Sequence, residues 1–229
     1  MPDKELTVDD TIWQISETLA DGKVMHYGVS QTGKLSVLLS PEKEDPSFDG
    51  QTAAFQSVLR QSSLVYDATD GYRERKIVYT MSGNTFAPAY FAVVDLERDG
   101  LPEVVLWMAL EDNPYVGYDV LRWEEGTVIS YSEVYRSLKG LKQDGTYFYS
   151  SGAFDHGVGM CAGFGEDGLN TTNLTWRSGE EYFVNNRPAS ADKFNAALTA
   201  QDEKPDVVWF ECTDENIRNL GGVIAAAVG

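Results

Sequence analysis

Positive charge and long hydrophobic runs are both scarce in this sequence of 229 residues. It has 18 lysines and arginines against 36 aspartates and glutamates, which gives a net charge of −18. A field of that sign repels nucleic acids and anionic lipid surfaces, so we expect neither as a partner. The apolar run at residues 221–228 is far shorter than the roughly 20 residues that span a membrane, so no membrane insertion is expected.

Cysteine is also rare, since only Cys161 and Cys212 are present. Neither lies in a CxxC pair or beside clustered histidines, so we expect free, buried thiols and no zinc site. Residues 1–5 are polar and are not followed by the apolar core of a signal peptide. The chain as given therefore predicts a cytoplasmic location, or an extracytoplasmic one if a leader has been removed.

Catalytic signatures are missing from the sequence, and we predict no catalytic residue. There is no Gly-x-Ser-x-Gly elbow and no His-Glu-x-x-His motif. The glycine-rich stretch at residues 157–165 lacks the Gly-Lys-Ser/Thr ending of a phosphate loop, so we interpret its glycines as strand or bulge positions. His156 precedes Cys161 by five residues, and we interpret the pair as an exposed histidine and a buried strand cysteine rather than as a nucleophile and its base.

The first fifty residues show two kinds of pattern. Residues 7–20 carry apolar side chains at helical spacing, with Thr7 as a cap, and predict a helix. Residues 23–30 and 34–40 are strand-like runs that predict a hairpin. A polar, proline-bearing connector follows at residues 41–50, so we expect an N-terminal segment, 1–50, that packs on a main domain, 51–229, as one structural domain.

The main part predicts an α+β fold. Residues 51–65 have helical spacing, although residues 64–66 equally suit a strand. Short apolar runs then alternate with turn signals from residue 76 to 185, which is typical of an antiparallel β-meander, sandwich-like or partly closed into a barrel. The C-terminal part predicts a helix near residues 190–199, a strand at 207–211 and a helix from Asp214, capped by Thr213. Helices therefore flank the meander at both ends.

One loop carries a specific pattern of acidic residues. Carboxylates stand at Asp95, Glu97 and Asp99, Gly100 permits a sharp turn, and Glu103 follows before a strand-like run. Ca²⁺ takes six to eight oxygen ligands, and alternating carboxylates on a tight loop can point toward one centre. We therefore predict a calcium site with these four carboxylates and the carbonyl of Leu101. A metal-free acidic turn is the open alternative.

This loop resembles the D-x-[DN]-x-D-G-x-x-[DE] hairpin loop of FG-GAP and related calcium-bearing β repeats. Residues 50–220 more widely resemble uncharacterised proteins and predicted lipoproteins of Gram-positive gut bacteria, through the aromatic run before Asp95, the strand at residues 118–123 and the segment at 209–217. The resemblance implies a bacterial protein with a β-meander and flanking helices, and it implies no particular activity.

Three functions remain open from the sequence. The first is a non-catalytic binding or interaction module, stabilised by calcium at the 95–103 loop. Seven aromatic residues could form its binding face for a protein or glycan partner, although core and cross-strand packing explains most of them more simply: Trp107, Tyr115, Tyr118, Trp123, Tyr147, Tyr149 and Trp176. The second is a glycan-directed hydrolase that uses paired carboxylates. The third is an acidic intracellular partner or inhibitor of a basic protein.

Overall fold

The computed structural model describes residues 11–18, 24–30, 35–39, 48–110, 113–124, 126–134, 136–165 and 168–227, the first three ranges as backbone only. The chain divides into two compact units, residues 1–47 and 48–229, close to the connector predicted at 41–50. The packing of the first unit on the second stays a prediction.

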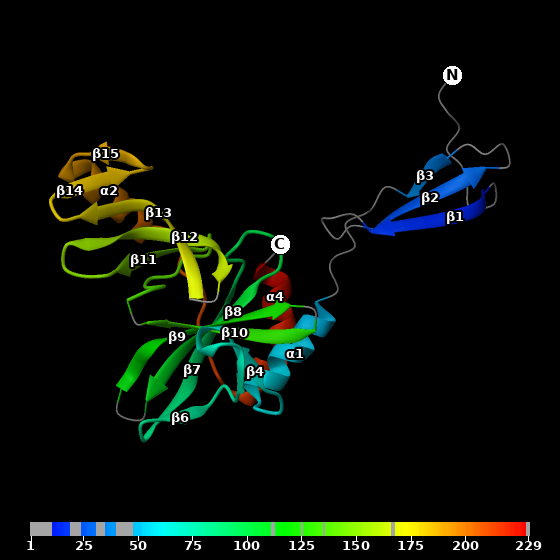
Figure 1. The fold of residues 1–229 in the computed structure, drawn as a ribbon, viewed down its shortest axis with the longest axis horizontal. Coiled ribbons are helices and arrows are strands. Elements are labelled where there is room, and N and C mark those ends of the chain that lie inside the picture. The colour runs from blue at the N-terminus through cyan, green and yellow to red at the C-terminus, as the bar shows by residue number, and fades with distance from the viewer. Residues whose placement is uncertain are drawn as a thin grey trace. The chain divides into compact units, whose positions relative to one another are not determined.

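The first unit contains a three-stranded antiparallel sheet of β1 (Thr11–Thr18), β2 (Val24–Ser30) and β3 (Leu35–Leu39) (Figure 1). The predicted hairpin is confirmed as β2 and β3. The helix predicted at residues 7–20 is wrong, because residues 11–18 pair with β2 as a strand. This segment is rich in threonine and isoleucine, whose β-branched side chains favour strands, and its apparent helical spacing covers too few turns to outweigh them. Thr7 lies outside the described residues.

An eight-stranded sheet forms the centre of the second unit, in the order β16-β7-β8-β9-β10-β4-β5 with β6 beside β7. Strands β7 to β10 form an antiparallel meander, and β4 joins it in parallel with β10. The strands are β4 (Val65–Asp67), β5 (Arg73–Arg75), β6 (Tyr79–Met81), β7 (Asn84–Val94), β8 (Glu103–Leu110), β9 (Asn113–Glu124), β10 (Thr127–Val134) and β16 (Phe210–Glu211).

Three helices cover one face of this sheet: α1 (Asp49–Leu59), α3 (Asp214–Arg218) and α4 (Leu220–Ala227). The predicted start and cap of α3 are confirmed, since the hydroxyl of Thr213 accepts a hydrogen bond of 3.2 Å from the N–H of Asn216. Helix α1 ends at Leu59, and residues 65–67 form β4 instead of continuing it. The core on this face includes Phe55, Val58, Phe91, Leu106, Leu121, Ile217 and Ile224.

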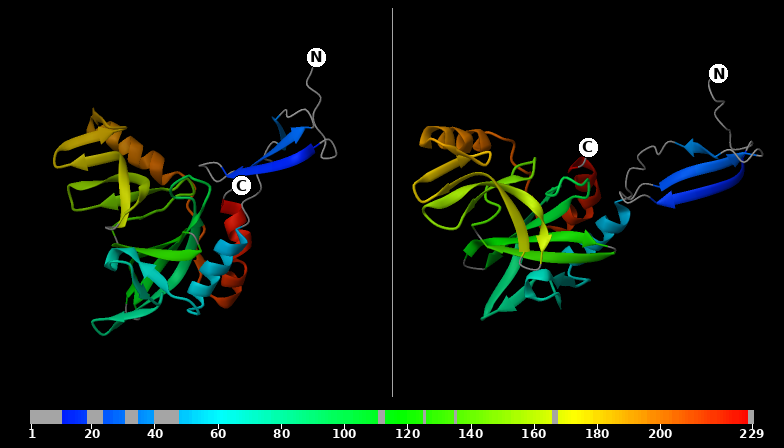
Figure 2. Two further views of the ribbon diagram at one scale, coloured as in Figure 1. Left: turned by 45° about the vertical axis from the view of Figure 1, so that its right-hand side comes forward. Right: turned by 45° about the horizontal axis from the view of Figure 1, so that its top comes forward.

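A five-stranded antiparallel sheet covers the other face, and helix α2 (Ala191–Asp202) packs on this second sheet. Along β8, Val104 and Leu106 face the helices while Val105 faces the second sheet, so both sides of the strand are buried and its sequence is almost continuously apolar. Figure 2 shows α1 and α4 on one side of the central sheet and the second sheet on the other. Its strands are β11 (Thr146–Ser150), β12 (Asp155–Gly165), β13 (Gly168–Ser178), β14 (Glu181–Val184) and β15 (Arg187–Ala189).

The α+β class and the antiparallel meander with flanking helices are therefore confirmed.

Candidate functional site

The 95–103 loop connects β7 and β8, and its carboxylates close the turn on backbone groups. Asp95 accepts hydrogen bonds from the N–H of Asp99 (3.1 Å, at Oδ1) and from the N–H of Gly100 (2.9 Å, at Oδ2). Asp99 in turn accepts one of 2.8 Å from the N–H of Leu101. Gly100 has a φ of +86°, the left-handed conformation that the sequence predicted for a turn glycine.

The two glutamates of this loop face Arg122 on β9. Oε2 of Glu97 lies 2.8 Å from Nη2 of Arg122, and Oε1 of Glu103 lies 4.0 Å from its Nε. The predicted ligands therefore contact backbone groups and an arginine. In the part of the chain that the structure describes, no three His, Cys, Asp or Glu side chains are grouped so as to hold a metal ion. The calcium site stays a prediction that these contacts do not support.

Glu103 is the most deeply buried acid of the loop, at 1% exposure. Burial, together with the neighbouring acids Asp99, Glu97 and Asp95, raises the pKa of its carboxyl to about 8, although the hydrogen bond from the N–H of Leu96 lowers it. Burial also raises the pKa of Glu97, against the effect of Arg122. The loop therefore places one carboxyl in the interior whose ionisation is unfavourable in neutral solution.

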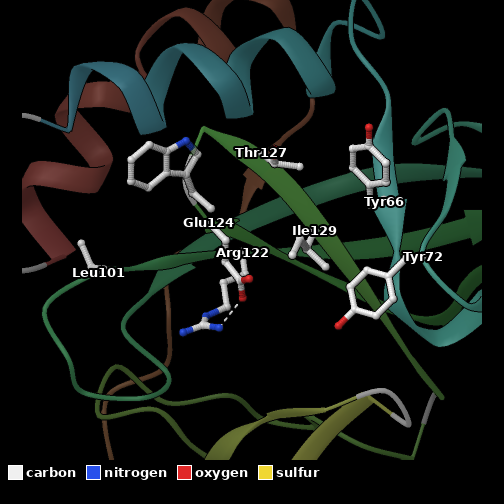
Figure 3. A pocket seen from close by; sticks show the side chains of 8 residues that line it. Tyr66, Tyr72, Leu101, Arg122, Glu124, Thr127 and Ile129 are labelled. Atoms are coloured by element: carbon white, nitrogen blue, oxygen red, sulfur yellow. Dashed lines mark hydrogen bonds and ion pairs between the residues drawn. The ribbon is translucent and has the colours of Figure 1, made fainter.

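An open pocket of about 730 Å³ lies beside this loop. Figure 3 shows the rings of Tyr66 and Tyr72 on one side, Leu101 on the other, and Arg122 with Glu124 between them. The pocket is assembled from β4, the turn before β5, the 95–103 loop and the adjacent ends of β9 and β10. Its lining residues are Tyr66, Tyr72, Leu101, Arg122, Trp123, Glu124, Thr127 and Ile129.

Arg122 is the functional candidate that the sequence analysis missed. Its guanidinium pairs with Glu124 as well as Glu97, and it lies over the ring of Phe164 with 5.3 Å from Cζ to the centroid. The nearby carboxylates raise its pKa, although burial opposes them. A signal was present in the sequence, because an arginine interrupts the apolar strand Val120-Leu121-Arg122-Trp123.

Tyr72 has an unusual backbone conformation. It follows Gly71, and both residues have positive φ, +65° and +56° respectively. Hairpin turns with two such residues usually hold Asn and Gly, and a bulky side chain there is a steric outlier. The ring is 47% exposed, and among the described residues the hydroxyl has no hydrogen-bond partner.

A buried ion-pair cluster fixes the hairpin that carries Tyr72. Arg75 on β5 lies 2.5 Å from Asp67 on β4 and 2.7 Å from Asp119 on β9. Ser132 on β10 also donates a hydrogen bond of 2.8 Å to Asp119. Because Asp67 and Arg75 stand on either side of the turn, the cluster holds both ends of the hairpin against the central sheet.

The aromatic residues proposed as one binding face lie in several places. Tyr147 and Tyr118 are buried, Trp107 packs against Tyr118 and Trp209, and Trp176 stacks on Phe183. Trp123 lines the Arg122 pocket, whereas Tyr149 lines a separate cleft of about 360 Å³ between β11 and α2. The side chain of Tyr115 lies outside the described residues. The six that are described therefore do not form one face, and core or cross-strand packing, the simpler explanation from the sequence, accounts for most of them.

The other features noted in the sequence have structural roles. His156 and Cys161 both lie on β12, and five residues of strand separate them by roughly 16 Å, too far for a nucleophile–base pair. The glycine-rich stretch is this same strand, with a bulge next to Gly163, as predicted. Both cysteines are free; Cys161 is buried and Cys212 is half-buried, and burial raises the pKa of each thiol to about 12.

Comparisons with protein-family models, curated proteins and solved structures found no match. The resemblance of residues 50–220 to predicted lipoproteins stays a prediction. Among the helices of the described residues, none combines the length and apolar character needed to cross a membrane.

Proposed function

We propose that the chain is a non-catalytic binding module and that the pocket around Arg122 is its ligand site. The observation that carries this proposal is Tyr72, whose half-exposed ring lines the pocket from a left-handed backbone. Residues held in such conformations cost about 1–3 kcal/mol and cluster at functional sites.

A structural role explains Tyr72 poorly. Its ring adds little to the core, and glycine or asparagine would fill the turn without strain. The buried cluster around Arg75 supplies the support that such a strained turn needs. A second tyrosine, Tyr66, is 37% exposed and lines the same pocket, so two rings are available to a ligand.

The pocket favours binding over glycan hydrolysis. Hydrolysis uses two carboxyl groups on either side of the scissile bond. Glu124 is the one carboxylate among the residues that line the pocket, and it is paired with Arg122. Glu103 has a raised pKa, but it is buried and bonded to the N–H of Leu96, so its carboxyl is not presented to a ligand. The inhibitor alternative rests on net charge alone.

A thermal-shift screen tests the binding role. The panel contains neutral oligosaccharides, lysine-rich peptides and acidic peptides, each added to the unmodified chain, to Tyr72→Ala and to Tyr90→Ala. Tyr90 is a matched control, because it is a 37% exposed tyrosine that does not line the pocket. We expect one class to raise the melting temperature of the unmodified chain and of Tyr90→Ala, and not of Tyr72→Ala. Shifts that persist in Tyr72→Ala, or no shift with any class, would overturn the proposal.

A further inference from the structure

We infer that the ligand of the Arg122 pocket is a neutral sugar ring, an inference that rests on the proposed binding role. It depends on two properties of the lining: the charge balance around Arg122 and the mixture of hydrogen-bond donors and acceptors beside an exposed aromatic ring.

Anionic ligands fit the pocket poorly. The guanidinium of Arg122 already contacts Glu124 and Glu97, and Glu103 lies 4.0 Å from its Nε. A phosphate or carboxylate ligand would have to displace Glu124 or Glu97 from Arg122 and would then meet the negative charge of these two side chains at short range. The net charge of −18 on the whole chain also repels anionic ligands.

Cationic ligands are also disfavoured, because Arg122 stands in the middle of the pocket (Figure 3). An ammonium group has donors only and could use the oxygens of Glu124, but it would compete with Arg122 for them. It would also lie close to a positive charge that the fold holds in place through Glu97.

Neutral hydroxyl groups match the lining. A guanidinium only donates and a carboxylate only accepts, whereas a hydroxyl does both, so adjacent hydroxyls of a sugar can bond Arg122 and Glu124 together. Thr127 also lines the wall. The ring of Tyr72, exposed and aimed at the pocket, provides a surface on which the apolar C–H face of a sugar can pack.

Isothermal titration of the full chain separates the possibilities. The probes are neutral hexasaccharides built from glucose, mannose, xylose or N-acetylglucosamine, together with hexalysine and an oligogalacturonate. We expect at least one neutral hexasaccharide to bind with an affinity that changes little between low and high salt. Glu124→Gln should weaken that binding roughly tenfold, since it replaces a charged acceptor, and Tyr72→Ala should weaken it at least as much.

Glu181→Gln is the matched control, because it removes the same charge from an exposed position on β14, and it should leave binding unchanged. Circular dichroism and melting curves establish that each variant is folded. Hexalysine or oligogalacturonate could instead bind in a salt-sensitive way that Tyr72→Ala abolishes. That result would support the pocket as a binding site and would overturn the inference that its ligand is a neutral sugar. Neutral sugar binding that survives both Tyr72→Ala and Glu124→Gln would place the sugar elsewhere and overturn this inference. Binding of none of the probes would overturn both proposals.

Discussion

The carboxyl of Glu103 accepts a hydrogen bond of 2.9 Å from the backbone N–H of Leu96, and this contact joins the two ends of the β7–β8 loop. Leu96 is fully buried and packs in the core beneath the second sheet. The loop is thus closed by a buried acid whose partner is a backbone group, next to the arginine that lines the pocket.

The raised pKa of Glu103 predicts that the stability of the fold decreases as pH rises. In the folded chain its pKa is about 8, above the ordinary value of 4.5 expected for the unfolded chain. Between these two pH values the folded state retains a proton that the unfolded state has released. The free energy of unfolding therefore falls as pH rises from about 4.5 to 8, by up to ~1.4 kcal/mol per pH unit. Urea unfolding at several pH values measures the trend.

Glu103→Gln tests the assignment, because an amide can still accept from the N–H of Leu96 but cannot ionise. We expect this variant to be more stable than the unmodified chain at pH 8 and to show a flatter pH dependence. Glu181→Gln, an exposed position on β14 outside this loop, should retain the original slope. An unchanged slope in Glu103→Gln would show that another group causes the pH dependence.

Calcium should have little effect on stability. Both oxygens of Asp95 already accept backbone N–H groups, and Glu97 and Glu103 face Arg122. We therefore expect the melting temperature to be the same with chelator and with millimolar Ca²⁺. A saturating ion at 100 times its Kd would add ~2.7 kcal/mol to the folded state. A rise of that size, absent in Asp95→Asn, would establish the calcium site that the sequence predicts.

Arg75→Ala should be strongly destabilising. It would leave Asp67 and Asp119 buried without their cation, and breaking such a pair costs about 3–5 kcal/mol. Arg73 on the same strand provides the control, since its ion pair with Asp70 is exposed and Arg73→Ala should change stability by less than ~1 kcal/mol. Chemical denaturation compares the two. Equal effects would show that the cluster does not hold the hairpin.

The positive φ of Tyr72 predicts that glycine is more stable than alanine at this position. Tyr72→Gly and Tyr72→Ala remove the same ring, but a φ of +56° is strained for alanine and not for glycine. We expect the glycine variant to be more stable by about 1 kcal/mol, the reverse of the usual preference. Thermal melts of the two variants decide this, and a more stable alanine variant would show that the backbone there is not left-handed.

Gly157→Ala should disrupt the second sheet. A Cβ at this position would lie 2.0 Å from the carbonyl oxygen of Thr175 on the neighbouring strand, which cannot move away without breaking the β12–β13 pairing. We expect a loss of about 3 kcal/mol or failure to fold. Gly152→Ala, with nothing within 4 Å of its Cβ, should stay within about 0.5 kcal/mol of the unmodified chain. Similar melting temperatures for the two variants would contradict this packing.

Local signals in the sequence determined much of the fold. The alternation of apolar runs and turns gave the meander, and Thr213 marked the start of α3, because strand patterns and helix caps depend on neighbouring residues. The glycines of four Asp-Gly pairs, Gly71, Gly100, Gly145 and Gly168, have the positive φ that favours this pair in tight turns. Gly50 does not, since that pair begins α1.

Only the tertiary structure decided which groups meet. Residues 11–18 form a strand because β2 pairs with them, a contact that helical spacing cannot reveal. The four acids of the 95–103 loop were visible in the sequence, but their partners were not. Arg122 is about twenty residues away along the chain and adjacent in space through the β8–β9 pairing. The packing of these strands therefore brings its guanidinium to the acids of the loop. Charges at contact distance interact far more strongly in a partly buried site than in water, and sequence separation says nothing about that distance.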